Sequence, residues 1–124
     1  MSVTLSLPAA LLWFATPDLA QAGTAAAPDP ARGERVFKLK GCVACHSTDG
    51  GKLVGPTWKG LFGSQVAVLA EGKETTVTAD DEYITRSIRH PPKEVVKGFA
   101  PQMPQADLKE RDIADLVAFI KGLR

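Results

Sequence analysis

The sequence has few of the side chains from which a small protein builds its core. Aromatic residues make up only 6% of its 124 residues, and a domain of this size buries a smaller share of its surface than a larger one does. The chain contains two cysteines, which excludes a scaffold held by several disulfide bridges. Nine prolines and eleven glycines predict long irregular connections. We therefore expect something other than side chains and disulfides to complete the core.

An excess of charge of either sign is also missing. Lys and Arg number 15 and Asp and Glu number 14, for a formal net charge of +1. The sequence has no run of basic residues and no basic residues interleaved with aromatic ones, so it predicts no nucleic-acid partner. Its length allows one small domain and excludes a multidomain enzyme.

The first 31 residues lack Lys and Arg altogether. Residues 5–15 are almost wholly apolar, and residues 20–22 form the small-x-small pattern of a cleavage site, so we predict a signal peptide over residues 1–22. The apolar stretch is shorter than the roughly 20 residues that span a bilayer. Because the basic segment of a signal peptide is missing, a membrane-anchor stub stays open as an alternative. The protein is expected to be periplasmic or otherwise exported, and membrane-associated only through that anchor or a partner complex.

Caps and apolar spacing predict an all-α domain at residues 31–124, with three main helices and long loops. Residues 23–30, rich in Ala, Gly and Pro, indicate a mobile linker before it. A small hairpin is possible at residues 66–69 and 75–78, whereas residues 93–106 are expected to be irregular. The first predicted helix spans residues 31–40. The second begins at a cap formed by Thr78 and Asp81 and ends at Pro91-Pro92. The third is capped by Asp107 with Glu110, ends at Gly122, and has an apolar stripe of Leu108, Ile113, Leu116, Val117 and Ile120.

The two cysteines lie in the pattern Cys42-Val43-Ala44-Cys45-His46, which is the attachment signature of c-type haem. Two thiols at this spacing can add to the two vinyl groups on one edge of a haem, and the adjacent His46 can then bind the iron. Haem would also supply the apolar filling that the composition lacks, and without it we expect the chain to be largely unfolded.

Three alternatives to haem attachment stay open for the cysteine pair. A disulfide or a thioredoxin-like redox pair normally lies within a strand–helix–strand unit, whereas Cys42 and Cys45 follow a predicted helix and enter a glycine-rich loop. A structural zinc ion needs two further ligands, and only His90 is a good one. A chance match to the pattern is the third alternative.

The second axial position of the iron decides what a haem can do. Met103, between Pro101 and Pro104, is the one methionine besides Met1. It lies in a polar loop outside any apolar stripe, which favours an iron ligand over a core methionine that fills a gap. His90 competes for this role, but its place just before two prolines indicates the exposed end of a helix.

The chain resembles the class I, mitochondrial-type cytochromes c from Ala31 to its C-terminus. The section from Tyr83 and Pro91 through Phe99 to Met103 is also similar to the cytochrome c domain of haem–copper oxidase subunit II. The motifs that carry the resemblance are Gly33 and Phe37, Cys42 to His46, Gly55-Pro56, Gly60-Leu61-Phe62-Gly63, Met103-Pro104, and Leu116 with Phe119.

The resemblance implies one covalent haem c, attached to Cys42 and Cys45 and bound axially by His46 and Met103. The Pro56 carbonyl would accept a hydrogen bond from His46. Gly33 would let the first helix cross closely over the last, and Trp58, Leu61 and Phe62 would line the haem pocket. Ser64 replaces an arginine that often supports a propionate in the family, so Trp58, Tyr83 or a lysine is left for that role.

These residues favour a monohaem electron carrier of a respiratory-type chain, not an enzyme, cycling between Fe(III) and Fe(II) with His–Met ligation. Its partners would be redox proteins: an electron donor and a terminal oxidase or other acceptor. Lys52, Lys59 and Lys73 either steer an acidic partner or are scattered surface lysines. The alternatives are a haem c subunit or domain of a membrane-bound oxidase complex, and a haem enzyme or gas sensor with an open axial position.

Overall fold

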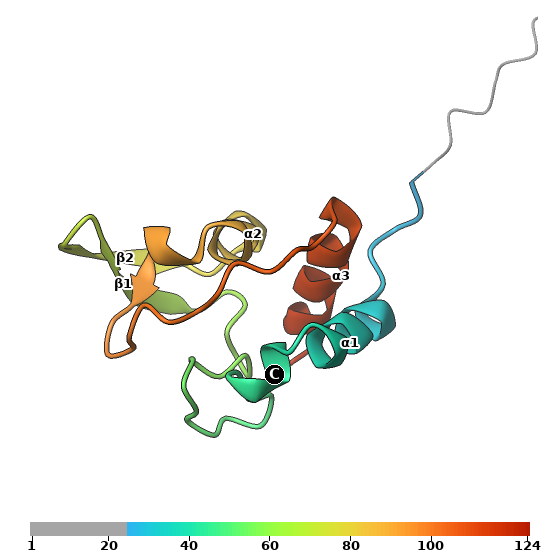
Figure 1. Ribbon diagram of the computed structural model, residues 1–124, viewed down its shortest axis with the longest axis horizontal. Helices are drawn as coiled ribbons and strands as arrows, with labels where there is room; N and C mark the ends of the chain where they lie inside the picture. Colours follow the sequence, from blue (N-terminus) through green and yellow to red (C-terminus); the bar gives the residue numbers. More distant parts are fainter. Residues whose placement is uncertain (1–24) are drawn as a thin grey trace, which may run out of the picture.

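The computed structural model describes residues 25–124, so the predicted signal peptide at residues 1–22 lies outside the described residues. None of the helices in residues 25–124 is long and apolar enough to cross a membrane. In chain order the elements are α1 (Pro30–Leu39), the 3₁₀ turn η1 (Cys42–Ala44), β1 (Gln65–Ala70), β2 (Lys73–Thr78), α2 (Asp81–Arg89), the 3₁₀ turn η2 (Pro91–Lys93), β3 (Val95–Val96) and α3 (Glu110–Lys121). The small sheet lies at one end of the molecule beside α2, and α1 and α3 lie together at the other end (Figure 1).

The first and last helices pack against each other. Asp29 caps α1 by accepting hydrogen bonds from the N–H groups of Ala31 and Arg32, and proline is well suited to the first helical position that follows. Gly33 is buried where α1 meets α3, and a Cβ atom there would overlap the Asp115 carbonyl and lie 2.8 Å from the Phe119 Cβ atom. The expected close crossing at Gly33 is therefore confirmed.

The N-terminal cap of α2 differs from the prediction. Asp80, not Thr78, is the N-cap residue, and its carboxylate accepts a hydrogen bond from the Tyr83 N–H group. Thr78 is instead the last residue of β2, where its backbone pairs with Gln65. The predicted end of the helix before Pro91 is confirmed. One face of α2 is buried, through Tyr83, Ile84 and Ile88.

The cap of α3 also differs, because Lys109 rather than Asp107 is its N-cap residue. The Lys109 N–H group donates to the Asp112 carboxylate one turn later at 3.0 Å, so an acidic side chain inside the first turn replaces the expected cap. Leu108 precedes the helix and is half-buried. The rest of the predicted stripe is confirmed: Ile113, Leu116, Val117 and Ile120 are all buried.

A three-stranded sheet of order β2-β1-β3 corrects the all-α description. The predicted hairpin is present and longer than expected, with antiparallel β1 and β2 joined through Glu71 and Gly72 at positive φ. The segment expected to be irregular contains β3, in which Val96 pairs with the fully buried Val68. Two residues are too few to give a sequence signal, so β3 depends on the edge that β1 offers.

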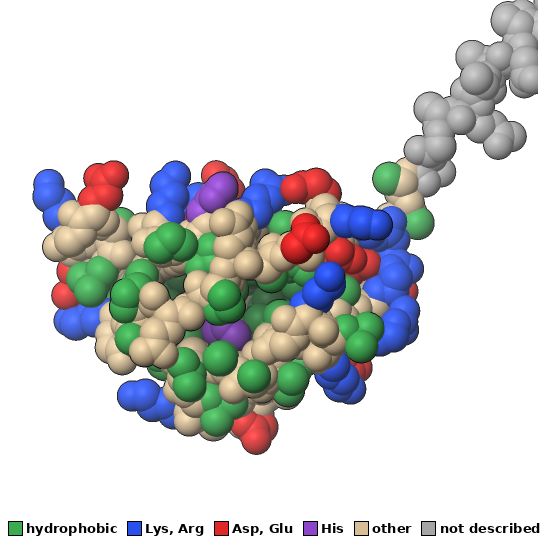
Figure 2. All heavy atoms as spheres, viewed as in Figure 1, with side chains coloured by type: hydrophobic (Ala, Val, Ile, Leu, Met, Phe, Trp, Pro, Cys, Tyr) green, Lys and Arg blue, Asp and Glu red, His purple; other side chains and the backbone are tan. Residues whose placement is uncertain are grey.

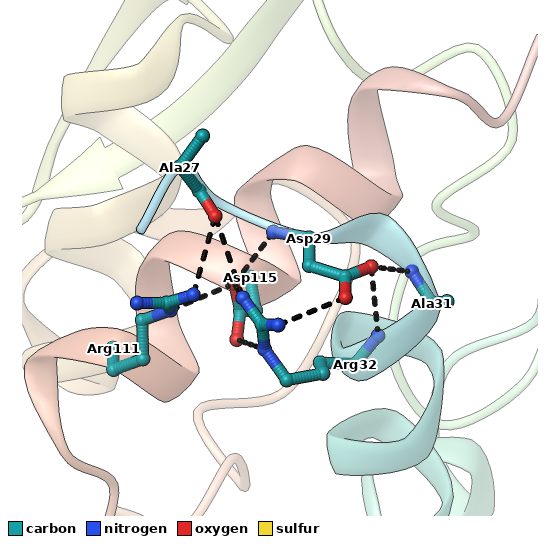
Figure 3. A network of polar contacts seen from close by, with 6 residues as sticks. All are labelled: Ala27, Asp29, Ala31, Arg32, Arg111 and Asp115. Atoms are coloured by element: carbon teal, nitrogen blue, oxygen red, sulfur yellow. Dashed lines mark hydrogen bonds and ion pairs between the residues drawn. The ribbon is translucent and has the colours of Figure 1, made fainter. Parts of the chain in front are cut away.

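The residues just before α1 are held against α3 (Figure 3). The Asp115 carboxylate, on α3, accepts hydrogen bonds from the Asp29 N–H group at 2.7 Å and from Arg32 Nε at 2.9 Å. Arg32 and Arg111 both donate to the Ala27 carbonyl. Residues 27–29, predicted as part of a mobile linker, are thus bonded to the domain.

Candidate functional site

A cleft of about 200 Å³ opens between η1, α2 and the segment that precedes α3. In Figure 2 the middle of this face is hollowed, with a histidine side chain inside the hollow and hydrophobic side chains around it. Most of the lining is apolar. The residues named from the sequence that line it are Cys42, Cys45, His46, Pro56, Trp58, Leu61, Met103 and Tyr83, the last named as a possible propionate partner.

Both thiols face this cleft from the turn that follows α1. Gly41 has φ = 80°, a left-handed conformation that ends the helix without strain and starts η1. The backbone then folds over itself, with the His46 N–H group donating to the Cys42 carbonyl at 2.9 Å. Cys42 and Cys45 are half-buried free thiols. Burial raises the pKa of the Cys42 thiol, with a smaller contribution from the neighbouring Cys45.

His46 is buried, with 8% of its surface exposed. Its Nδ1 atom lies 2.7 Å from the Pro56 carbonyl oxygen, as expected. Because a carbonyl only accepts hydrogen bonds, Nδ1 carries the proton and Nε2 keeps a free lone pair. Burial lowers the pKa of His46 although the Pro56 carbonyl acts in the opposite direction. The imidazole is thus held neutral, in the tautomer that can bind a metal through Nε2.

The backbone and rings around His46 restrict its position. A Cβ atom at Gly55 would lie 2.6 Å from His46 Cε1, so only glycine leaves room for the imidazole. On another side, the Trp58 ring centroid is 5.1 Å from that of His46 and 4.9 Å from that of Phe37. Trp58 is buried and lines the cleft. These contacts hold the imidazole in one place.

Two residues named from the sequence lie away from the cleft. Phe62, expected in the haem pocket, does not line it; its ring lies beneath the Lys121 ammonium, 4.9 Å from the centroid. His90 is the exposed C-cap residue of α2 and is likewise absent from the lining. Of the two candidate axial ligands, the structure brings only Met103 to the same cleft as His46. Met103 is 38% exposed.

Ser64, which replaces the family's arginine, also lies outside the cleft lining. Its hydroxyl donates to the Leu61 carbonyl at 2.6 Å and its backbone N–H bonds the same oxygen. Ser64 therefore stabilises a turn, and its hydroxyl does not contact a ligand in the cleft.

The sequence did not predict that α2 forms one side of the cleft. The sequence predicts this helix, but nothing in its spacing shows that one of its faces borders a cleft. Further lining comes from the segment after β3 and from α3. The missed residues are Ile84, Ser87, Ile88, Val96, Phe99 and Ile120.

The residues present fit a haem. Two free thiols and an imidazole with an available Nε2 share one mostly apolar cleft. Ser87 and Tyr83 of α2 line the same cleft. Burial raises the pKa of Tyr83, and a hydrogen bond with the Ser87 side chain acts in the opposite direction.

The alternative roles of the cysteine pair find no matching geometry. In the described part of the chain, no three His, Cys, Asp or Glu side chains gather as a metal site would require. The pair follows a helix and begins in a 3₁₀ turn, not in a strand–helix–strand unit.

Fold and site together define the class of small proteins in which three helices and long loops enclose one haem. The Cytochrome c family model matches residues 30–124, and the chain belongs to this family. It is 38% identical over 112 residues to a cytochrome c2 of Blastochloris viridis, covering 82% of this chain and 84% of its relative. It is 37% identical over 109 residues to a cytochrome c of Chlamydomonas reinhardtii, covering 78% and 91%.

The chain is therefore a class I monohaem cytochrome c with one covalently attached haem c. It is an electron carrier, not an enzyme, and its partners are redox proteins.

Proposed function

We propose that Cys42 and Cys45 carry the haem through two thioether bonds and that His46 and Met103 are its axial ligands. The observation that carries this assignment is the hydrogen bond from His46 Nδ1 to the Pro56 carbonyl, which leaves Nε2 free in the cleft that both thiols line. Met103 borders the same cleft. Bound haem supplies a one-electron Fe(III)/Fe(II) couple, which side chains alone do not provide.

His46 and Pro56 set the electron donation on one side of the ring. A histidine ligand that donates its second N–H to a carbonyl is fixed in orientation and is a stronger donor. A thioether ligand from Met103 would favour Fe(II) and raise the reduction potential. With His46 and Met103 both bound to the iron, no position would be left for a substrate, so the site would exchange electrons and nothing else.

The apolar lining keeps water away from the haem. Ile84 and Ile88 of α2 and Ile120 of α3 are buried and border the cleft. An apolar pocket would need little rearrangement when the charge on the iron changes by one, which would suit rapid and reversible transfer. The proposed role is one step of a respiratory-type chain, between an electron donor and a terminal oxidase or other acceptor.

We further propose that the protein is exported, with residues 1–22 as its signal peptide, and that it works in the periplasm. A soluble carrier would be released from cells by osmotic shock. A subunit of a membrane-bound oxidase complex, or a chain held by an uncleaved anchor, would require detergent. Mass spectrometry of the purified holoprotein tests the cleavage site directly.

The ligand assignment is tested by absorption spectroscopy of the purified holoprotein and of the variants Met103→Ala and His90→Ala. We expect a ferric sulfur-to-iron charge-transfer band in the wild type and in His90→Ala, and its loss in Met103→Ala together with a fall in the reduction potential. Cys42→Ala combined with Cys45→Ala should abolish the haem colour that survives denaturing electrophoresis.

Two results would contradict the assignment. If the wild type lacked the band, Met103→Ala left the spectrum unchanged and His90→Ala changed it, the second ligand would be the histidine. If wild-type ferrous protein bound carbon monoxide readily at neutral pH, an axial position would be open, and the haem enzyme or gas sensor would be favoured over the carrier.

A further inference from the structure

Large hydrophobic side chains are exposed beside the cleft. Leu39 is 83% exposed, Val43 is 47% exposed and Leu53 is 46% exposed. We call these three residues the apolar rim. Each is next in sequence to a residue that lines the cleft: Lys40, Cys42 and Val54, respectively. The apolar rim therefore borders the opening on the side of the two thiols.

A ligand in the cleft does not account for this exposure. None of the three rim residues lines the cleft, so a haem held there leaves them at the surface. Packing within the described residues does not account for it either, because none of the three belongs to the core cluster or packs against it. Exposed apolar side chains that gather around an opening generally mark a contact site.

The charged side chains around the opening are few and already engaged. Among residues 25–124 only Lys40 and Glu94 line the cleft as charged residues. The Lys40 ammonium donates to the Asp107 carbonyl at 3.2 Å. The Glu94 carboxylate accepts hydrogen bonds from Arg86 at 2.8 and 3.2 Å.

The neighbouring lysines are engaged in the same way. Lys97 bonds Glu74 at 3.0 Å, and the Lys52 ammonium lies 5.5 Å from the Phe99 ring centroid. Lys73 pairs with Ala70 at the end of the hairpin, and neither Lys73 nor Lys59 lines the cleft. In Figure 2 the Lys and Arg side chains lie mostly around the margin of the cleft face. The surface complementary to this face is accordingly apolar rather than acidic.

We propose that the apolar rim is the docking surface for a redox protein whose own electron-exchange site is surrounded by an apolar face. This inference rests on the proposed function, because it places electron transfer at the cleft opening. Association through such a face depends on buried apolar area and is weakly sensitive to salt, whereas association through charges weakens steeply as salt rises.

The test uses the purified holoprotein and gold electrodes coated with methyl-terminated or carboxylate-terminated alkanethiol layers as the probe. Voltammetry measures the adsorbed redox-active protein and its electron-transfer rate at low and high salt. We expect adsorption and fast transfer on the methyl surface at both salt concentrations. Val43→Glu and Leu53→Glu should adsorb about tenfold more weakly, the change expected when burial of one Val or Leu side chain is lost.

Leu69→Glu is the matched control, because Leu69 is 41% exposed, lies in β1 and is outside the cleft lining. It makes the same change of charge and should adsorb like the wild type. The proposal would be overturned if Leu69→Glu lost as much adsorption as Val43→Glu. It would also be overturned if the wild type adsorbed preferentially to the carboxylate surface with strong salt dependence. The absorption spectrum in solution distinguishes the two proposals. A wild-type spectrum that shows no His–Met haem would contradict the proposed function. A His–Met spectrum together with no preference for the methyl surface would contradict only the docking surface.

Two further measurements address other occupants of the apolar rim. Sedimentation velocity should show a monomer, and vesicles of phosphatidylcholine should not bind the protein. A dimer, or vesicle binding, that Val43→Glu abolishes would assign the rim to a second copy of the chain or to a lipid surface and would overturn the assignment to a redox protein.

Discussion

Gly33 of α1 lies directly against the backbone carbonyl of Asp115 in α3, so closely that a Cβ atom at Gly33 would overlap that oxygen. Gly33→Ala normally favours a helix by about 1 kcal/mol. Here we expect the opposite, a loss of at least about 1–3 kcal/mol in the free energy of unfolding, because the clashing atom is backbone and cannot rotate away. Denaturant unfolding of the holoprotein measures this change.

Gly122→Ala is the control for that substitution. Gly122 has φ = −81°, and a Cβ atom there would lie 3.4 Å from the Phe119 carbonyl oxygen, which is a tolerable contact. Its stability should stay within about 0.5 kcal/mol of the wild type, as for an ordinary surface substitution. An increase in stability for Gly33→Ala would show that the two helices are free to separate.

The features that the sequence predicts are those that depend on residues close together in the chain. The helices and the hairpin are predicted by local apolar spacing and turn residues, and the Cys42–His46 motif predicts haem attachment. The caps at Asp80 and Lys109 were missed because several acidic residues compete within one turn. The strand β3 was missed because its partner is distant in sequence.

Within the candidate site, residues adjacent to the motif were easier to predict than residues across the cleft. Cys42, Cys45 and His46 are placed by one local turn, whereas Ser87 is brought to the cleft by packing of the whole helix α2. Phe62 shows the converse: a family motif names the residue, but its ring turns toward Lys121.

Asp115 is expected to make stability depend on acid pH. Its side chain is 2% exposed and accepts hydrogen bonds from the Asp29 N–H group, Arg32 and Arg111. Burial alone would raise its pKa, but the Asp29 and Arg32 contacts outweigh burial, so the pKa of Asp115 is lower than usual. Because the unfolded carboxyl binds its proton first, near pH 3.9, the stabilisation is complete above about pH 5 and is lost as pH falls through the folded pKa.

Asp115→Asn isolates this contribution. Removing one partner of a largely buried ion pair should cost about 2–4 kcal/mol at pH 7, and the wild-type and variant stability curves should converge as pH falls below about 4. Glu34→Gln, which breaks the exposed Glu34–Lys38 pair, should cost less than about 1 kcal/mol. A gap between wild type and Asp115→Asn that stays constant down to pH 2 would assign the loss to shape instead of charge.

Gly55→Ala should displace the imidazole of His46. The added Cβ atom would lie 2.6 Å from His46 Cε1 and 2.9 Å from Nδ1, and the imidazole is already confined by Pro56 and Trp58. We expect a changed ferric spectrum and a stability loss of about 1–3 kcal/mol, because the crowded ring must move. Leu53→Ala is the control, because Leu53 is exposed, near Gly55 and outside the cleft lining, and it should leave the spectrum unchanged. Equal spectral changes in both variants would mean that the loop around Gly55, not the His46 ring, is disturbed.

Glu94→Gln should loosen the segment that carries Met103. Arg86 of α2 donates two hydrogen bonds to the Glu94 carboxylate, just before β3, and the Glu94 side chain is only 13% exposed. Loss of this charge should cost about 1.5–3 kcal/mol, the usual contribution of a hydrogen bond to a charged group. A looser segment should release the proposed Met103 ligand more often, so ferrous Glu94→Gln should bind carbon monoxide faster than the wild type and show a weaker ferric sulfur-to-iron band. Glu74→Gln breaks the exposed Lys97–Glu74 pair on the same segment and should change the binding rate little. If both variants bound carbon monoxide at the wild-type rate, the Arg86–Glu94 pair would have no part in holding Met103 at the cleft.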